Sequence, residues 1–270
     1  MARPKTYQCE AIVLGYTALG EADILVTLFT RDQGKVRAVG KSARRATSKL
    51  VGHLEPLTAV KMSMVHGRSI DIISQAEVIN SFSTLKEDLT GIAKGLYLAE
   101  MMTGFGAEAS PNPDLFQLMI DTLRIIEADP GSEMALRYFE YHLLGVSGLM
   151  PELYHCVECR EELEPGAHRF SPNLGGTLCL ECGPEDAHLR PLSLRALKVL
   201  RLLDRSQLAD ACKLTIDDNL SYELKILLST TVTYWLGNEI RSNSFLEHLR
   251  NETLPEVYIC LLYTSPSPRD

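Results

Sequence analysis

The apolar residues of this chain change their spacing at about residue 81, and that change constrains the fold more than any other feature of the sequence. Before it, apolar and polar residues alternate in short runs, as at Ile24, Val26 and Leu28, which is the period of a half-buried β-strand. Beyond it, apolar residues recur every three or four positions, as an amphipathic helix requires: Leu85, Leu89, Ile92, Leu96 and Ala99. The sequence therefore predicts a β-rich part joined to an α-helical part, the α+β class.

Five strand-like runs fit into residues 1–80, with one longer polar connection between the third and the fourth. This arrangement matches a small β-barrel of the oligonucleotide-binding (OB) type. We therefore predict an OB-fold domain over residues 1–80 and a helical domain over residues 81–252. Residues 253–270 fit neither period, and we expect a disordered or artefactual tail there.

Four cysteines are the strongest local signal. Cys156 with Cys159 and Cys179 with Cys182 form two C-x-x-C pairs, 19 residues apart, a spacing typical of four-cysteine zinc sites. Four sulfurs leave no open position for water, so the predicted zinc is structural and organises a module over residues 153–190. The alternatives are two local disulfides, which a reducing cytosol disfavours, and a redox dithiol, which needs only one pair.

Residues 34–49 hold six cations and no carboxylate, in a chain whose formal net charge is −8. We call this set the basic ribbon; its members are Lys35, Arg37, Lys41, Arg44, Arg45 and Lys49. An uninterrupted basic run of this kind predicts contact with a nucleic-acid phosphate backbone. The alternative is a solvated edge, because lysines also keep exposed strands from pairing.

The sequence offers no catalytic pattern. The glycines at 34 and 40, followed by Lys41 and Ser42, nearly spell a phosphate-binding loop, but five residues separate them where the motif has four. The seven histidines are scattered, with no nucleophile elbow and no H-E-x-x-H. We therefore expect a protein that is not an enzyme.

The N-terminus lacks the pattern of a signal peptide, and no apolar run approaches the roughly 20 residues that span a bilayer. We expect a cytoplasmic protein with no membrane partner.

A second basic feature lies in residues 192–205, where helical spacing predicts one stripe of four cations: Arg195, Lys198, Arg201 and Arg205. Such a stripe could hold an acidic, hydrophobic peptide. A solvated face with long side-chain stems is the favoured interpretation.

Three stretches together resemble the RecO family of bacterial recombination mediators: "GEADILVTLFTRDQGKVRAVGKSARR", "LLGVSGLMPELYHCVECREEL…FSPNLGGTLCLEC" and "YWLGNEIRSNSFLEHL". The resemblance extends over residues 5 to about 252. It implies an OB barrel, a helical domain and a zinc module within that domain.

The resemblance also implies a function. A member of this family binds single- and double-stranded DNA at the nucleoid, anneals complementary strands, and acts with RecR to load RecA onto strands coated by single-stranded DNA-binding protein (SSB). The acidic C-terminal tail of SSB is then expected to contact the helical domain. Two other classes stay open: a protein-interaction adaptor whose barrel does not touch DNA, and a metal-dependent nuclease.

Overall fold

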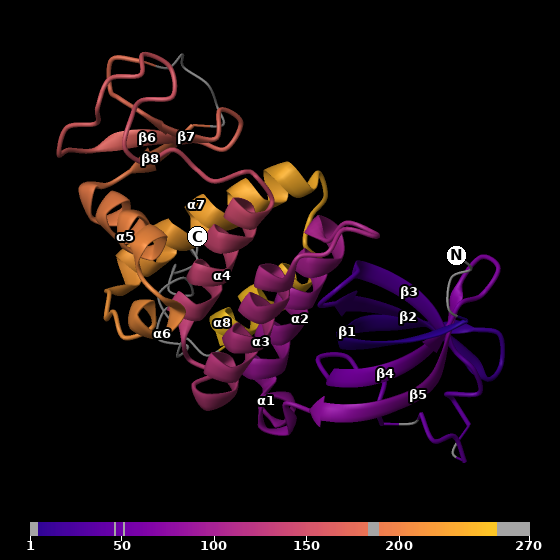
Figure 1. The fold of residues 1–270 in the computed structure, drawn as a ribbon. Helices are drawn as coiled ribbons and strands as arrows, with labels where there is room; N and C mark the ends of the chain where they lie inside the picture. Colours follow the sequence, from indigo (N-terminus) through magenta and orange to yellow (C-terminus); the bar gives the residue numbers. More distant parts are fainter. Residues whose placement is uncertain (1–4, 46, 51, 183–188, 253–270) are drawn as a thin grey trace, which may run out of the picture.

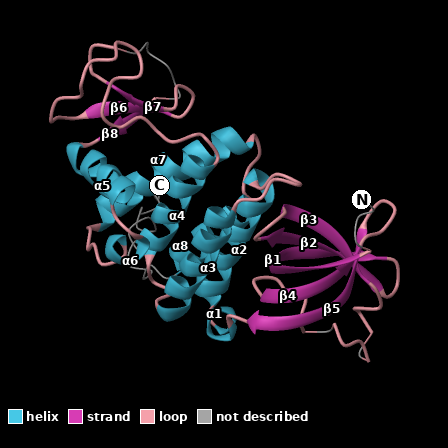
Figure 2. Cartoon of the chain, viewed as in Figure 1, coloured by secondary structure: helices cyan, strands magenta, loops and turns pink. Residues whose placement is uncertain are grey.

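The computed structural model describes residues 5–45, 47–50, 52–182 and 189–252. The structure comprises a β-barrel, a group of helices and a small cysteine-rich sheet, which is inserted in the chain between the fourth and fifth helices; in space the helices lie between the other two parts (Figures 1 and 2). In the described residues, no helix is both long and apolar enough to cross a membrane. The tail predicted over residues 253–270 lies outside the described residues.

Five strands form the barrel: β1 (Thr6–Leu19), β2 (Asp23–Thr30), β3 (Gly34–Gly40), β4 (Ala59–Val65) and β5 (Asp71–Asn80). The order around the closed barrel is β1-β2-β3-β5-β4, and only the β3–β5 pair is parallel. The α+β class and the N-terminal barrel predicted from the sequence are confirmed.

Alternating side chains fill the barrel. Val26 and Leu28 of β2 are fully buried, as are Val60 and Met64 of β4, because every second residue of a strand faces the same side. The connection between β3 and β4, residues 41–58, folds back on the barrel and contributes Leu54 to the same core.

Several of the helices begin at a residue whose side chain caps the first turn. Asn112 accepts the backbone N–H of Leu115 (2.9 Å) at the start of α3, with Pro113 in its first turn, and Asp217 accepts that of Leu220 (3.0 Å) at the start of α7. Both contacts satisfy donors that a helix leaves open. The helices are α1 (Ser83–Glu87), α2 (Leu89–Phe105), α3 (Pro113–Ala128), α4 (Glu133–Val146), α5 (Leu194–Arg205), α6 (Leu208–Ala211), α7 (Asp218–Leu236) and α8 (Arg241–Glu252).

One hydrophobic core joins the barrel to the helices. Phe29 of β2 and Leu57 of the long connection pack in the same cluster as Tyr97 and Met102 of α2. The segment after α2 closes against β3 as well: the backbone N–H of Lys35 donates to the carbonyl of residue 107 (3.1 Å). The core therefore continues across the change from strands to helices.

Glycine is required at the point of closest approach. Gly34 has φ +70°, and a Cβ there would lie 2.1 Å from the carbonyl oxygen of Ser110. Both the left-handed backbone and the lack of space exclude a larger side chain at this position.

The cysteine-rich part follows α4 and contains three short strands: β6 (His168–Ser171), β7 (Gly176–Leu178) and β8 (Arg190–Leu192). Their order in the sheet is β7-β6-β8. Figure 1 shows this sheet beyond the ends of α5 and α7, on the side of the helices away from the barrel.

Candidate metal centre and nucleic-acid interface

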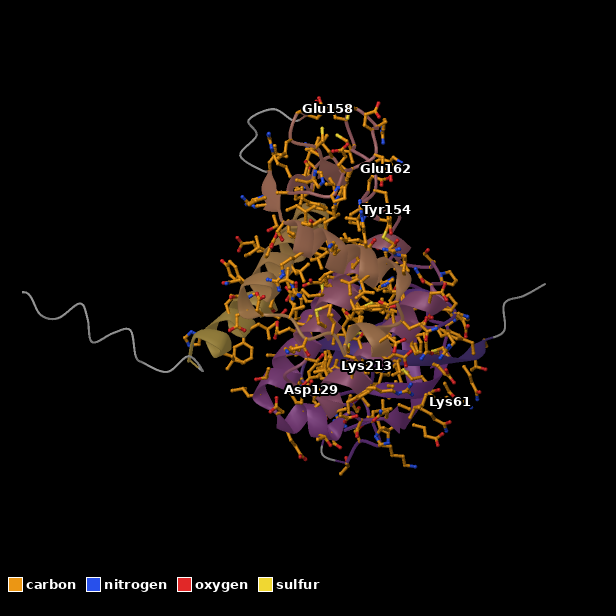
Figure 3. All side chains as sticks on the ribbon, turned by 90° about the vertical axis from the view of Figure 1, so that its left-hand side faces the viewer. Lys61, Asp129, Tyr154, Glu158, Glu162 and Lys213 are labelled. Carbon is orange, nitrogen blue, oxygen red and sulfur yellow. The ribbon has the colours of Figure 1, made fainter. Side chains whose placement is uncertain are left out.

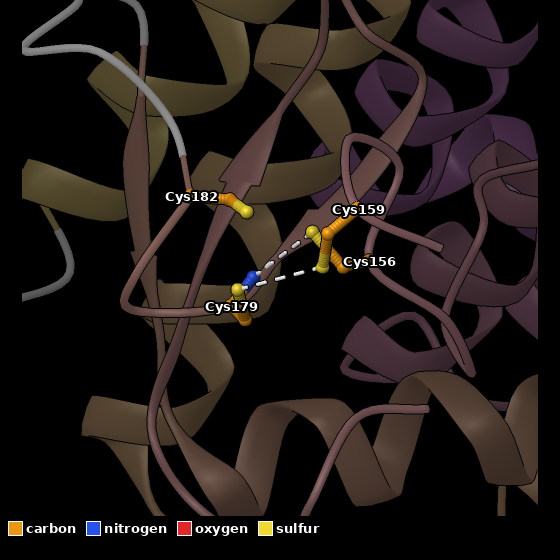
Figure 4. Close-up of side chains that lie close together, drawn as sticks. All are labelled: Cys156, Cys159, Cys179 and Cys182. Atoms are coloured by element: carbon orange, nitrogen blue, oxygen red, sulfur yellow. Dashed lines mark hydrogen bonds between the residues drawn. The ribbon is translucent and has the colours of Figure 1, made fainter. Parts of the chain in front are cut away.

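The first C-x-x-C pair lies on a tight turn. The backbone N–H of Cys156 donates to the carbonyl of Glu161 (2.9 Å), and that of Arg160 returns to the carbonyl of Cys156 (3.0 Å). Arg160 takes φ +68°, as a reversal this sharp requires. The turn places the sulfurs of Cys156 and Cys159 on one side, facing the second pair (Figure 4).

All four sulfurs converge. The Sγ atoms of Cys156, Cys159, Cys179 and Cys182 lie within 4.8 Å of one another. Those of Cys159 and Cys179 are 4.0 Å apart, far beyond a disulfide bond, and the described cysteines are free. Four sulfurs about 2.3 Å from a central zinc would stand roughly 3.8 Å apart, so the set fits a metal ion of that size.

The charges of the thiols also favour a cation. Burial raises the pKa of the Cys156 thiol, but backbone N–H groups, including those of Cys179 and Cys159, point at its sulfur and lower the pKa to about 6. Hydrogen bonding with Cys179 raises the pKa of Cys182 to about 12. Ionisation of one thiol therefore disfavours ionisation of its neighbours. A divalent metal ion bound between them would allow all four thiols to ionise.

The cysteine-rich part is attached to the helices by Arg201. Its Nε and Nη2 donate to the carbonyl of Leu153 (2.9 and 2.7 Å), and its guanidinium lies 4.8 Å from the centre of the Tyr154 ring. In Figure 3 Tyr154 lies where the two parts meet, Glu158 lies at the far end, and Glu162 lies between them. Arg195 of the same predicted stripe pairs with Asp217.

The near half of the basic ribbon, Lys35 and Arg37, is engaged within the chain. Lys35 Nζ donates to the carbonyl of Thr103 at the end of α2 (2.8 Å). Arg37 pairs with Glu108 (3.2 Å), and both of these side chains are more than half exposed. The exposed pair is in contact with water, so it contributes little stability.

The far half of the basic ribbon, Lys41, Arg44, Arg45 and Lys49, lies in the connection after β3, and all four residues are exposed. Arg44 Nη1 donates to the carbonyl of Gly20 (3.2 Å) at the tip of the β1–β2 hairpin. Within the described residues, no ion pair or hydrogen bond engages the side chains of the other three. The structure thus divides the six cations of the basic ribbon into two groups, one on β3 and engaged within the chain, the other exposed in the connection after β3.

Sequence reasoning missed Arg68. It is exposed in the β4–β5 loop and lines a groove of about 520 Å³ together with residues of β3, which include Lys35 and Arg37.

 A single arginine between His66 and Ser69 gives no charge run, so only its place beside β3 reveals it. The loops at β1–β2 and β4–β5 are the ones with which OB barrels hold oligonucleotides.

A buried charge cluster in the helices was also missed. Glu140 of α4 is fully buried, accepts the hydroxyl of Tyr97 (2.7 Å) and lies 2.9 Å from Nη1 of Arg137, which is 3% exposed. Lys94 is 2% exposed and pairs with Glu133 (2.9 Å). Burial raises the pKa of Glu140 to about 7. The signal in the sequence was a pair of opposite charges on the apolar face of a helix, three residues apart.

Comparisons with known proteins agree across the chain. Residues 1–82 match the family model "Recombination protein O N terminal", and residues 86–244 match "Recombination protein O C terminal". A DNA repair protein RecO from Dehalococcoides mccartyi (strain BAV1) is 34% identical over 250 residues, 93% of this chain and 98% of the relative. One from Desulforudis audaxviator is 36% identical over 245 residues, 91% of this chain and 98% of the relative. A third, from Roseiflexus sp. (strain RS-1), is 35% identical over 92% of this chain and 87% of the relative.

Proposed function

The chain belongs to the RecO family, which gives it a role in DNA repair and recombination, and from this premise we propose that it is a recombination mediator. It binds single- and double-stranded DNA, anneals complementary strands and, with RecR, helps to load RecA onto single strands coated by SSB. It acts in the cytoplasm, at the nucleoid, and breaks no covalent bond.

The observation that carries this proposal is the far half of the basic ribbon. Lys41, Arg45 and Lys49 are exposed on an OB barrel, and no described residue pairs with their side chains. Free cations at the surface can neutralise phosphates and leave the bases open for pairing, which annealing requires.

The division of labour within the chain is part of the proposal. Residues 1–80 carry the DNA surface, residues 81–252 form the helical domain, and the module over residues 153–190 is held by one structural zinc on Cys156, Cys159, Cys179 and Cys182. The acidic tail of SSB contacts the helical domain. Lys198 is the exposed cation of the α5 stripe that remains a candidate for that contact, since Arg195, Arg201 and Arg205 have partners within the chain.

An adaptor that does not touch DNA is the second candidate. The observation that favours it is the engagement of the near half of the basic ribbon, where Lys35 donates to Thr103 and Arg37 pairs with Glu108. An adaptor would show no affinity for oligonucleotides, so a titration with single-stranded DNA separates the two candidates.

We expect the double variant Arg44→Ala, Arg45→Ala to bind every DNA sequence more weakly, because contacts with the backbone position a protein but do not specify bases. Fluorescence anisotropy over a salt series measures this. Four contacting cations predict a slope of log affinity against log salt near −2.8 for single strands, at about 0.7 per phosphate, and six predict about −4. The double variant should reduce the slope by roughly 1.4.

The matched control is Arg124→Ala with Lys213→Ala, which removes one exposed cation from α3 and one from the turn after α6 and should leave the slope unchanged. If the plots of log affinity against log salt have the same slope and intercept for wild type and for the Arg44, Arg45 variant, the basic ribbon is only a solvated edge. Labelled DNA that is cut in the presence of magnesium would point to a nuclease instead.

Replacing Glu108 by Gln should strengthen DNA binding. Glu108 pairs with Arg37 at 3.2 Å on the barrel surface. Its carboxylate therefore competes with a DNA phosphate for the Arg37 guanidinium. Removing that charge is expected to make the salt slope steeper by about 0.7, one additional phosphate. The same anisotropy series measures the change, and Glu162→Gln, an exposed carboxylate of the cysteine-rich part, is the control. A slope that stays at the wild-type value in Glu108→Gln would show that Arg37 does not contact DNA.

A further inference from the structure

The barrel exposes one aromatic ring. Residues 1–80 contain three aromatic side chains, those of Tyr7, Tyr16 and Phe29. Phe29 is 1% exposed in the core, and Tyr7 donates its hydroxyl to Asp71 (2.7 Å) and stacks on His66. Tyr16 is 52% exposed. Packing and hydrogen bonding therefore account for the first two rings and leave Tyr16 without such an explanation.

Tyr16 lies on a projecting part of the sheet. Strand β1 pairs with β4 only as far as Ile12, and from Gly15 to Leu19 it pairs with β2 alone, with Tyr16 opposite Val26. The end of β1 that carries Tyr16 thus extends past its pairing with β4, while β2 stays paired with β3. A ring on such an extension is open to a ligand that the closed barrel could not admit.

The ring shares a face of the hairpin with the long connection. Side chains two residues apart point to the same side of a strand, so Tyr16 lies on the side of Ala18, whose partner across the hairpin is Ile24. A Cβ built on Gly40 would lie 3.1 Å from Ile24 and 3.0 Å from Leu54. Leu54 belongs to the connection 41–58, so this connection packs on the face that carries Tyr16.

Hydrogen bonds fix the far half of the basic ribbon at the same end of the hairpin. The backbone N–H of Ser42 donates to Asp23 Oδ1 (2.7 Å). The backbone N–H of Arg44 donates to the carbonyl of Ala22 (2.9 Å), and its guanidinium donates to that of Gly20 (3.2 Å). An exposed ring and a group of cations therefore occupy one end of the barrel.

We propose that Tyr16 is a stacking platform for a base of single-stranded DNA whose phosphates lie on the far half of the basic ribbon. This inference rests on the proposed function. Every base has a π-face, so stacking on an aromatic ring adds affinity without sequence preference. In a duplex the base faces are already covered by neighbouring base pairs. Tyr16 therefore makes the barrel distinguish single strands from duplexes, which cations alone do not.

The test compares Tyr16→Ala with wild type on a single strand and on a duplex of the same length. The single strand should bind roughly 5- to 150-fold more weakly, the range for loss of one stacked base. The duplex affinity should not change. The salt slope should stay at the wild-type value for both, because no phosphate contact is lost. Tyr16→Phe should restore the affinity for single strands, since it keeps the ring.

The control variant is Tyr222→Ala, which removes a similarly exposed ring (58%) from α7, away from the barrel. A strand of abasic nucleotides supplies a test that does not depend on folding of the variant: wild type and Tyr16→Ala should bind it equally. Equal loss of affinity for single strand and duplex, or no loss for either, would overturn the role of Tyr16. If wild type binds no DNA, the proposed function itself fails; if Arg44→Ala, Arg45→Ala weakens binding and Tyr16→Ala does not, only the stacking role fails.

Discussion

Cys179→Ser should lower zinc content and local stability together. The four sulfurs lie within 4.8 Å of one another, and a metal that binds only the folded site contributes its binding free energy to folding, about 10–16 kcal/mol in small zinc domains. We expect one zinc per wild-type chain by elemental analysis and much less in the variant. Hydrogen–deuterium exchange should rise over residues 152–182 and stay low in the barrel strands.

Cys212→Ser is the matched control, because Cys212 is partly buried but stands outside the cluster. It should retain full zinc. Chelation of wild-type protein should reproduce the exchange pattern of Cys179→Ser. Protein purified without chelator and found to contain no zinc, or a Cys179→Ser variant with a full complement of metal, would contradict the structural zinc site.

Glu140→Ala should destabilise the helical part by about 3–5 kcal/mol, the cost of leaving one partner of a buried ion pair uncompensated. Arg137 is 3% exposed and its Nη1 lies 2.9 Å from Glu140. The substitution therefore leaves a buried guanidinium without its carboxylate partner. Urea unfolding at pH 8, above the pKa of about 7 that burial gives Glu140, measures the loss. The combined variant Arg137→Met, Glu140→Leu should recover most of it, because apolar replacement of both partners removes the stranded charge.

The pH dependence of the same pair has a defined sign. Burial raises the pKa of Glu140 in the folded protein from 4.5 to about 7, so the folded state holds a proton that the unfolded chain releases. Its contribution to stability is complete below about pH 4.5 and declines as the pH rises through about 7. The stability of wild type relative to Glu140→Gln should therefore be greater at pH 5 than at pH 8. An equal difference at both values would mean that Glu140 does not titrate in this range.

The sequence predicted the parts of the fold that depend on neighbouring residues. The period of Ile24, Val26 and Leu28 indicates a strand, and the spacing of four cysteines indicates a metal site, because in each case the signal lies within one short stretch. The parallel pairing of β3 with β5 joins segments more than 30 residues apart. No local pattern could predict it, although the OB resemblance of the five runs did indicate the barrel.

The basic ribbon shows the same limit. Its six cations are evident in the sequence, but the partner of Arg37 is Glu108, 71 residues away, and only the packed segment after α2 reveals the pair. Likewise, the sequence left three barrel aromatics equivalent, and burial separates Tyr16 from Phe29. Contact of these cations with DNA stays a prediction.

The core shared by barrel and helices affects how this protein can be dissected. A fragment cut after β5 would expose to water the surfaces of Phe29 and Leu57 that now pack with α2, and apolar patches of that kind lead to aggregation. Failure of such a fragment to bind DNA would report its solubility and not its binding surface. Genetic separation of DNA binding from partner binding therefore calls for point substitutions at exposed positions in the intact chain.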